Sequence, residues 1–282
     1  MTIYRIIFLL VLIFPLAGFA QNTQTTLEGH ITNVDGQPIS YANIGIVGTA
    51  RGTVSDSNGY FVLYYDRQLH RSDTLRCSVI GYAARDFALQ PLSGQLDITL
   101  QRSALELPEV VVRGDLDQNK IIGNTKARGD RNVNFALAKQ PRQNLGASIG
   151  KLIKLKGVTS QLERFHFYVR QNNFASAKFR ITLHRLRKRK PHQSMTDQSI
   201  IVTLSPKQTG WVEVDLRPYQ LITDEDFVIS IQWVDASEQG RRLNIPLQFP
   251  KFGHTHYYQF GSQDKWRRFA NMSTAMYVEL RQ

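Results

Sequence analysis

The chain has 282 residues, with 35 Lys and Arg against 23 Asp and Glu, so its formal net charge is +12 at pH 7. This length is ample for two domains, but it is too short for a receptor built on a roughly 22-stranded membrane barrel with a plug, which we therefore exclude. The single cysteine, Cys77, excludes an internal disulfide, so the burial of apolar cores must hold the fold together. We expect Cys77 to be a buried structural thiol, because no histidine is placed to activate it.

Residues 1–20 have the pattern of a secretory signal peptide. Arg5 precedes an apolar run over residues 6–14, and small residues precede an expected cleavage point between Ala20 and Gln21. No later stretch approaches the roughly 18 consecutive apolar residues of a membrane-spanning helix. We therefore expect an exported chain whose mature form has no transmembrane span and which resides in the periplasm, at the outer membrane or at the cell surface.

Residues 26–102 have the pattern of a first β-sandwich domain, with short alternating strands roughly ten residues apart. Alternation over residues 42–46 and again over 60–64 predicts two strands, which we expect to pair as a hairpin. Between them, Asp56-Ser57-Asn58-Gly59 predicts a turn in which the Asp56 side chain caps the backbone and Gly59 adopts a positive φ. A calcium loop fits less well, because no closing bidentate carboxylate follows at the required distance.

Short turn and strand motifs follow one another in order through residues 26–113. They are Gly29-His30-Ile31, Asp35-Gly36-Gln37-Pro38, Ala42-Asn43-Ile44, Gly48-Thr49, Gly52-Thr53, Asp56-Ser57-Asn58-Gly59-Tyr60-Phe61, Ser78-Val79-Ile80-Gly81-Tyr82 and Leu107-Pro108-Glu109-Val110-Val111-Val112. In this order they resemble the carboxypeptidase-like regulatory domain, which in bacteria often precedes TonB-dependent outer-membrane receptors. The resemblance implies a small sandwich of the transthyretin or immunoglobulin-like type that carries no catalytic residues.

Residues 103–146 are expected to link this domain to a second one. The run Leu105–Val112 is rich in β-branched residues and contains Pro108. It is either the last edge strand of the sandwich or a strand offered to the sheet edge of a partner. From Asp115 to Gly146 few residues are apolar, which predicts a loop-rich connector.

Residues 147–282 predict a second β-sandwich, which we expect to be a jelly roll of about eight strands. Apolar residues alternate over 165–169, 179–183 and 227–233, and no stretch sustains a helical period. Trp211 and Trp233 lie within such strands, so we expect both in the core. The basic charge belongs to this half, because residues 102–282 carry 29 Lys and Arg against 16 Asp and Glu.

The most basic stretch of the chain runs from Arg185 to Lys190 and is expected at a loop or hairpin tip. It is either a solvated loop or a contact for an anion, such as an acidic polysaccharide or a lipid headgroup. Export argues against a nucleic acid, and no aromatic residues interleave with the run as they do where bases stack. Its candidate ligand-binding residues are Arg185, Arg187, Lys188, Arg189 and Lys190.

Aromatic residues gather around the turn at residues 261–264, and they either pack in the core or form a stacking platform for a sugar. They are Tyr257, Tyr258, Phe260, Trp266 and Phe269. Of these we take Tyr258 and Trp266 as candidate ligand-binding residues.

The sequence contains no catalytic or cofactor motif in a fitting context. His254 and His256 would share one face of a strand, but no third zinc ligand is visible nearby. We therefore expect a non-catalytic binding or assembly module of the bacterial envelope that needs no cofactor and recognises a glycan or another anionic surface ligand. The alternative is an accessory partner of an outer-membrane protein of a TonB-dependent transport system, through strand pairing. A third hypothesis is an unrecognised hydrolase.

Overall fold

The computed structural model describes residues 24–66, 68, 70, 73–90, 92, 94–103, 116–139 and 141–282. Within these ranges the regular structure consists of β-strands and one short 3-10 helix, η1 (Arg217–Tyr219), which confirms the all-β prediction. None of the described residues belongs to a helix long and apolar enough to cross a membrane. The expected signal peptide and the run Leu105–Val112 lie outside the described residues.

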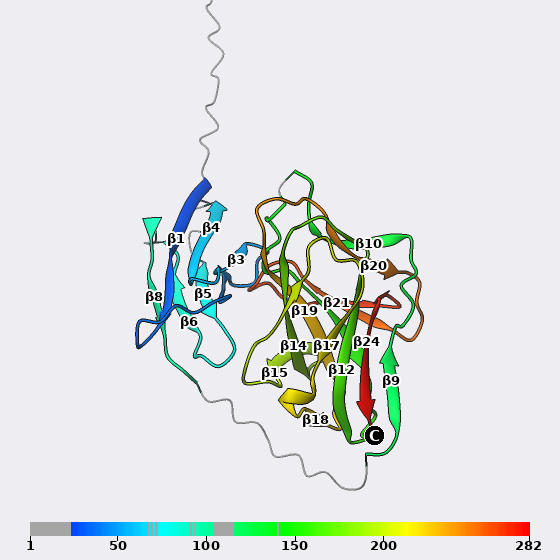
Figure 1. Ribbon diagram of the computed structural model, residues 1–282. Helices are drawn as coiled ribbons and strands as arrows, with labels where there is room; N and C mark the ends of the chain where they lie inside the picture. The colour runs from blue at the N-terminus through cyan, green and yellow to red at the C-terminus, as the bar shows by residue number, and fades with distance from the viewer. Residues whose placement is uncertain are drawn as a thin grey trace, which may run out of the picture.

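The N-terminal strands form a small sandwich of two four-stranded sheets, seen in blue to green-cyan in Figure 1. One sheet contains β4 (Tyr60–Asp66), β1 (Gln24–Asn33), β7 (Gly94–Gln95) and β8 (Ile98–Leu100). The other contains β3 (Gly52–Val54), β2 (Asn43–Ile46), β5 (Thr74–Ser78) and β6 (Arg85–Ala88). Alternate residues of both sheets meet in one apolar cluster, and the buried Cys77 belongs to it. Burial raises the pKa of the Cys77 thiol to about 12.

The hairpin expected between residues 42–46 and 60–64 is wrong, because β2 and β4 lie in different sheets. β2 pairs instead with β3 and β5, while β4 pairs with β1. The three-residue strand β3 was too short to recognise as an alternating pattern. The turn itself is confirmed: Asp56 Oδ1 accepts hydrogen bonds from the N–H groups of Asn58 (2.8 Å) and Tyr60 (2.9 Å), and Gly59 has φ +78°.

The second half of the chain is a jelly roll, as predicted. Its eight principal strands are β9 (Asn119–Gly123), β11 (Ser148–Ile153), β12 (Ser160–Val169), β14 (Ala177–Arg187), β16 (Ile200–Leu204), β17 (Gly210–Asp215), β19 (Phe227–Ala236) and β24 (Met276–Arg281). Numbered in this order, they form two antiparallel sheets with the strand orders 1-8-3-6 and 2-7-4-5. That order is two interlocked Greek keys. Phe167 and Phe179 meet between the sheets with ring centroids 5.6 Å apart.

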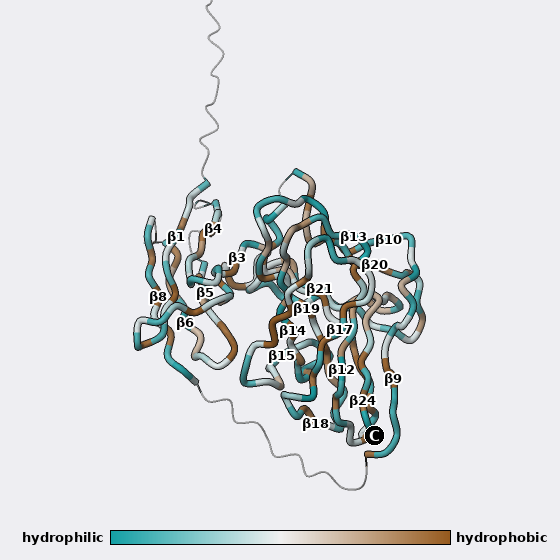
Figure 2. The backbone as a smooth tube through the Cα atoms, viewed as in Figure 1, coloured by the Kyte–Doolittle hydropathy of each residue, from teal (hydrophilic) through white to brown (hydrophobic). Residues whose placement is uncertain are grey.

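Further short strands extend these sheets or lie beside them. They are β10 (Arg131–Ala136), β13 (Gln171–Asn172), β15 (Lys190–Ser194), β18 (Ile222–Thr223), β20 (Leu243–Gln248), β21 (Thr255–Gln259), β22 (Arg267–Ala270) and β23 (Ser273–Thr274). With β15, β21 and β22 added, the sheet that contains β14, β19 and β11 has seven strands. Figure 2 shows that apolar segments follow the strands of this larger unit.

Two sequence predictions need correction here. The stretch 115–146 is no loop-rich connector, because β9 pairs with β24, β10 pairs with β20, and Phe135 is fully buried in the second core. Its apolar content is low because β9 is an edge strand with one exposed face. Trp211 is 36% exposed, since its neighbours Val212 and Val214 take the inward face of β17. The domain boundaries at 26–102, 103–146 and 147–282 otherwise stay a prediction.

The N-terminal sandwich contacts one end of the outer face of the seven-stranded sheet. Tyr41 is the main contact: its hydroxyl accepts a hydrogen bond from Lys178 Nζ at 2.6 Å, and its ring centroid lies 5.1 Å from that nitrogen. Ser262 Oγ donates to the carbonyl oxygen of Ile44 at 2.8 Å. Polar groups from both units therefore meet across this contact.

Candidate ligand-binding face

The outer face of the seven-stranded sheet carries polar side chains along the two neighbouring strands β14 and β19. On β14, Phe179, Ile181 and Leu183 face the core, so Arg180, Thr182 and His184 face outward. Ser230 and Gln232 of β19 face outward by the same alternation. These residues are nevertheless largely buried, because the N-terminal sandwich and the segment that carries Trp266 lie over the face. Two cavities remain along it.

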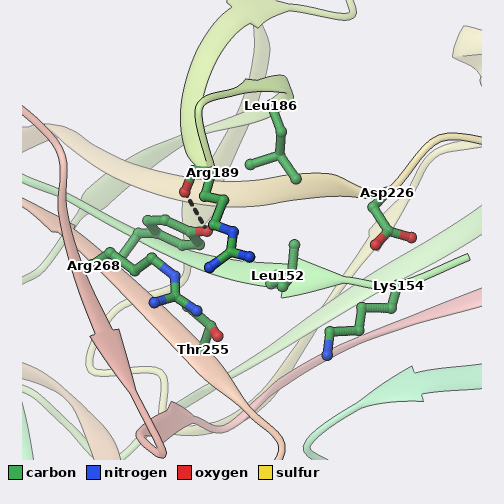
Figure 3. A pocket seen from close by; sticks show the side chains of 8 residues that line it. Leu152, Lys154, Leu186, Arg189, Asp226, Thr255 and Arg268 are labelled. Carbon is green, nitrogen blue, oxygen red and sulfur yellow. Dashed lines mark hydrogen bonds between the residues drawn. The ribbon is translucent and has the colours of Figure 1, made fainter. Parts of the chain in front are cut away.

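The cavity far from the N-terminal sandwich has a volume of about 370 Å³. It is lined by Leu152, Lys154, Leu186, Arg189, Asp226, Thr255, Tyr257 and Arg268. We call it the cationic cavity. Figure 3 shows the side chains of Lys154, Arg189 and Arg268 extending into the same opening from three different segments of the chain.

The positive charge of the cationic cavity is not neutralised from within. Asp226 is its only lining carboxylate, and Oδ1 of that residue accepts hydrogen bonds from the backbone N–H groups of Leu155 (2.8 Å) and Lys156 (3.1 Å). Among the described residues, Lys154, Arg189 and Arg268 form no ion pair with a carboxylate. With three cations against one carboxylate, the lining carries a net positive charge.

Arg189 reaches the cavity through a tight turn between β14 and β15. Arg187 pairs with Lys190, and the two residues between them, Lys188 and Arg189, have φ values of 50° and 61°. A two-residue turn with positive φ at both positions usually carries Asn-Gly, because a side chain is disfavoured in this region. The Tyr257 hydroxyl donates a hydrogen bond to the Arg189 carbonyl oxygen at 2.9 Å, which ties the turn to β21.

The second cavity lies where the two units meet and has a volume of about 260 Å³. It is lined by Asn43, Ser78, Ile80, Ser148, Arg180, Thr182, His184, His192, Ser194, Ser230, Gln232, Gln259, Ser262 and Trp266. We call it the interdomain cavity. Burial lowers the pKa of Arg180 to about 10 and that of His184 to about 4, so His184 is neutral at pH 7.

The structure separates the residues that the sequence grouped together. Of the basic run, only Arg189 lines a cavity; Arg185 is paired with Glu225 at 2.6 Å. Arg187, Lys188 and Lys190 are exposed and line neither cavity.

The two aromatic candidates, Tyr258 and Trp266, also lie in different places. Trp266 lines the interdomain cavity, with its ring centroid 5.6 Å from that of His184. Tyr258 packs against the second core and lines neither cavity. The sequence reasoning missed Lys154, Arg180 and Arg268. The alternation along a strand predicts which residues point away from the core, but it does not indicate that other parts of the chain cover that outer face.

A separate buried cluster surrounds Lys151, which shares its strand face with Ile149 and Ile153. Lys151 Nζ donates to Ser273 Oγ at 2.7 Å and lies 3.0 Å from His254 Nδ1. Burial, with a smaller contribution from Lys251, lowers the pKa of Lys151 to about 7. In the described part of the chain, no three His, Cys, Asp or Glu side chains are grouped as metal ligands.

Comparison with known proteins identifies the N-terminal unit. Residues 27–112 match the family model of the CarboxypepD_reg-like domain, which confirms the resemblance seen in the sequence. The TonB-dependent receptor SusC of Bacteroides thetaiotaomicron is 31% identical over 112 residues. That match covers 39% of this chain and only 10% of the receptor.

Similarity to solved structures is weak. The cysteine protease and lectin-like domains of Cwp84, a surface layer associated protein of Clostridium difficile, align with a TM-score of 0.44 at 10% identity, covering 82% of this chain and 45% of that one. A second structure of the clostridial protease Cwp84 aligns with a TM-score of 0.42 at 10% identity, covering 86% of this chain and 66% of that one. The identification therefore rests on the N-terminal match, and neither comparison names the jelly roll.

Proposed function

We propose that this protein is an exported, non-catalytic binding module of the bacterial envelope, and that its jelly roll recognises an acidic glycan through the cationic cavity. The observation that carries the proposal is the convergence of Lys154, Arg189 and Arg268 on one opening without carboxylate partners of their own. Guanidinium groups pair with carboxylates, sulfates and phosphates in a fork geometry, so two arginines favour such groups on the ligand.

The volume of the cavity supports a glycan segment. About 370 Å³ falls within the roughly 300–1,000 Å³ of sites that enclose small organic ligands. Tyr257 and Leu152 add apolar wall area against which a sugar ring can pack. The similarity of the N-terminal domain to part of an outer-membrane receptor supports the envelope location.

The test is binding of the full chain to acidic and neutral polysaccharides, with two matched variants. Arg189→Gln removes a charge that lines the cavity, and Lys188→Gln removes one from the adjacent turn position, which also has a positive φ. We expect the parent to bind acidic but not neutral chains and Arg189→Gln to bind about tenfold more weakly, while Lys188→Gln stays within about twofold of the parent. Equal weakening by both variants, or binding to anionic lipid vesicles alone, would contradict the proposal.

A second candidate function is that of an accessory partner of an outer-membrane TonB-dependent transport protein. The identity of 31% to SusC over 112 residues favours it, because related domains can share a docking partner. The strand expected to pair, Leu105–Val112, lies outside the described residues. Recovery of a receptor from envelope extract by the parent, but not by Val111→Pro, would support this function over glycan binding.

A further inference from the structure

The interdomain cavity is walled by both units of the protein. Asn43, Ser78 and Ile80 come from the N-terminal sandwich, and the remaining lining residues come from the jelly roll. The two parts are joined at the wall itself: Gln232 Nε2 donates to Asn43 Oδ1 at 2.9 Å, and Gln263 Nε2 donates to Ser78 Oγ at 2.8 Å. The cavity is thus a built feature of the contact between the two units.

Arg180 places an uncompensated positive charge in this wall. The side chain is 2% exposed, and no Asp or Glu lines the cavity. Its Nη1 donates to Gln232 Oε1 at 2.9 Å and its Nη2 donates to the Tyr41 carbonyl oxygen. Its buried Nε has no hydrogen-bond partner among the described residues. A buried guanidinium with a free N–H is costly unless an acceptor reaches it, and an anionic acceptor fits best.

His184 supplies the complementary group, an acceptor. The Ser230 hydroxyl donates to the Thr182 carbonyl oxygen at 3.2 Å, which uses its only proton. With the Ser230 proton assigned to that carbonyl oxygen, we assign the hydrogen of the His184 ring to Nε2, which lies 2.8 Å from the same hydroxyl and donates to it. In the neutral imidazole the other nitrogen, Nδ1, is then a bare acceptor, and it is buried without a partner among the described residues. A ligand at this point must donate a hydrogen bond.

The remaining walls fit one sugar ring. The volume of about 260 Å³ is below the roughly 300 Å³ at which sites begin to hold drug-sized molecules. The indole of Trp266 offers a flat apolar surface beside His184. The hydroxyls of Ser148 and Thr182 also line the cavity and form no hydrogen bond with another described side chain.

We propose that the interdomain cavity binds a single carboxylate-bearing sugar unit, such as a uronic acid. Arg180 Nε–H donates to the carboxylate, His184 Nδ1 accepts from a ring hydroxyl, and Trp266 packs against the ring. The cavity differs from the cationic cavity in its lining residues, so this proposal stands even if the cationic cavity binds nothing.

The test is titration of the full chain with glucuronate and galacturonate, with glucose and acetate as the neutral-sugar and simple-carboxylate controls. We expect at least one uronate to bind about tenfold or more tightly than glucose and than acetate, because both the charge and the hydroxyls contribute. If acetate binds as tightly as the uronates, the cavity is a simple anion site and the sugar assignment is overturned. If none of the four binds, the cavity holds water only and the proposal is overturned.

Substitutions in the lining test whether the uronate binds in the interdomain cavity. Arg180→Gln should weaken uronate binding about tenfold. Thr182→Val should weaken it several-fold without loss of folding, because it replaces a hydroxyl that lines the cavity by a methyl group of similar size. Arg187→Gln is the matched control, because Arg187 lies on the same strand and its loss removes the same charge, but it is exposed and does not line the cavity. Uronate binding by Thr182→Val and Arg180→Gln that equals that of the parent would overturn the assignment.

Discussion

The Tyr257 hydroxyl donates a hydrogen bond of 2.9 Å to the backbone carbonyl oxygen of Arg189. This bond joins β21 to the turn between β14 and β15, and both residues line the cationic cavity. Burial raises the pKa of Tyr257, so its hydroxyl keeps the proton that it donates throughout the neutral range. The position of the Arg189 side chain therefore depends on a residue far from it in the sequence.

Replacing Tyr257 with Phe should release the turn. The free energy of unfolding should fall by about 1 kcal/mol, the usual contribution of one such hydrogen bond. Affinity for an acidic polysaccharide should fall several-fold, because Arg189 loses its fixed position above the cavity. Denaturant unfolding and polysaccharide titration of the same preparation measure both effects. A stability loss with unchanged affinity would show that the anchoring of the turn does not matter for binding.

Lys188 and Arg189 have turn conformations that lower stability, but we expect Arg189 to contribute to binding. Lys188→Asn with Arg189→Gly installs the pair that two-residue turns of positive φ prefer, and should raise the free energy of unfolding by about 1 kcal/mol. The same double variant should lose polysaccharide affinity, because it removes the Arg189 guanidinium. Lys188→Asn alone is the control and should keep the affinity of the parent. A double variant that binds as well as the parent would remove Arg189 from the site.

Local features of the sequence predicted the structure best. The turn at residues 56–59 could be predicted because an Asx side chain and a glycine determine its geometry without outside help. The pairing of β2 with β3 and β5 could not, because alternation defines a strand face but not the neighbour of the strand. The jelly roll followed from the number and spacing of strands, whereas the short strands β9 and β10 were missed because most residues around them are polar.

The candidate site was predictable only in part. The basic run was visible because its charges are consecutive, yet the turn geometry brings only Arg189 to the cavity. Lys154 directly follows β11 and Arg268 lies on β22; these two strands are joined through β21 and lie far apart in sequence. Arg180 looked like an ordinary outward residue of an amphipathic strand. Its burial depends on the docking of Tyr41, which no sequence pattern indicates.

Gly59 should be required for the N-terminal sandwich. A Cβ at this position would lie 2.5 Å from the Ile31 carbonyl oxygen, in a backbone conformation with φ +78°. Gly59→Val should lower the free energy of unfolding by on the order of 1–3 kcal/mol or more. Gly36→Val is the matched control, because Gly36 has φ +76° but open space around its Cβ position. Urea unfolding should show the larger loss for Gly59→Val, and equal losses would mean that the contact with Ile31 is unimportant.

Lys151 should make stability depend on alkaline pH. Its pKa is about 7 in the folded protein and about 10.5 in the unfolded chain, so between these values the unfolded state binds more protons. Stability should therefore rise with pH from about 7 to about 10.5, by about 1.4 kcal/mol for each unit of pKa difference. Lys151→Met should abolish this rise, and Lys120→Met, at an exposed position, should not. If the free energy of unfolding varies with pH in the same way for the parent and for Lys151→Met, the lowered pKa of Lys151 is contradicted.

We propose that the cationic cavity, and not the basic run as a whole, binds an anionic glycan. The most direct measurement compares two triple variants with the parent, by their affinity for one acidic polysaccharide at about 50 and about 300 mM NaCl. One variant changes Lys154, Arg189 and Arg268 to Gln, and the other changes Arg187, Lys188 and Lys190, which removes the same charge from residues that line neither cavity. We expect the first variant to bind weakly with little dependence on salt, while the second keeps most of the affinity and salt dependence of the parent. Equal loss in both variants, or the greater loss in the second, would contradict it.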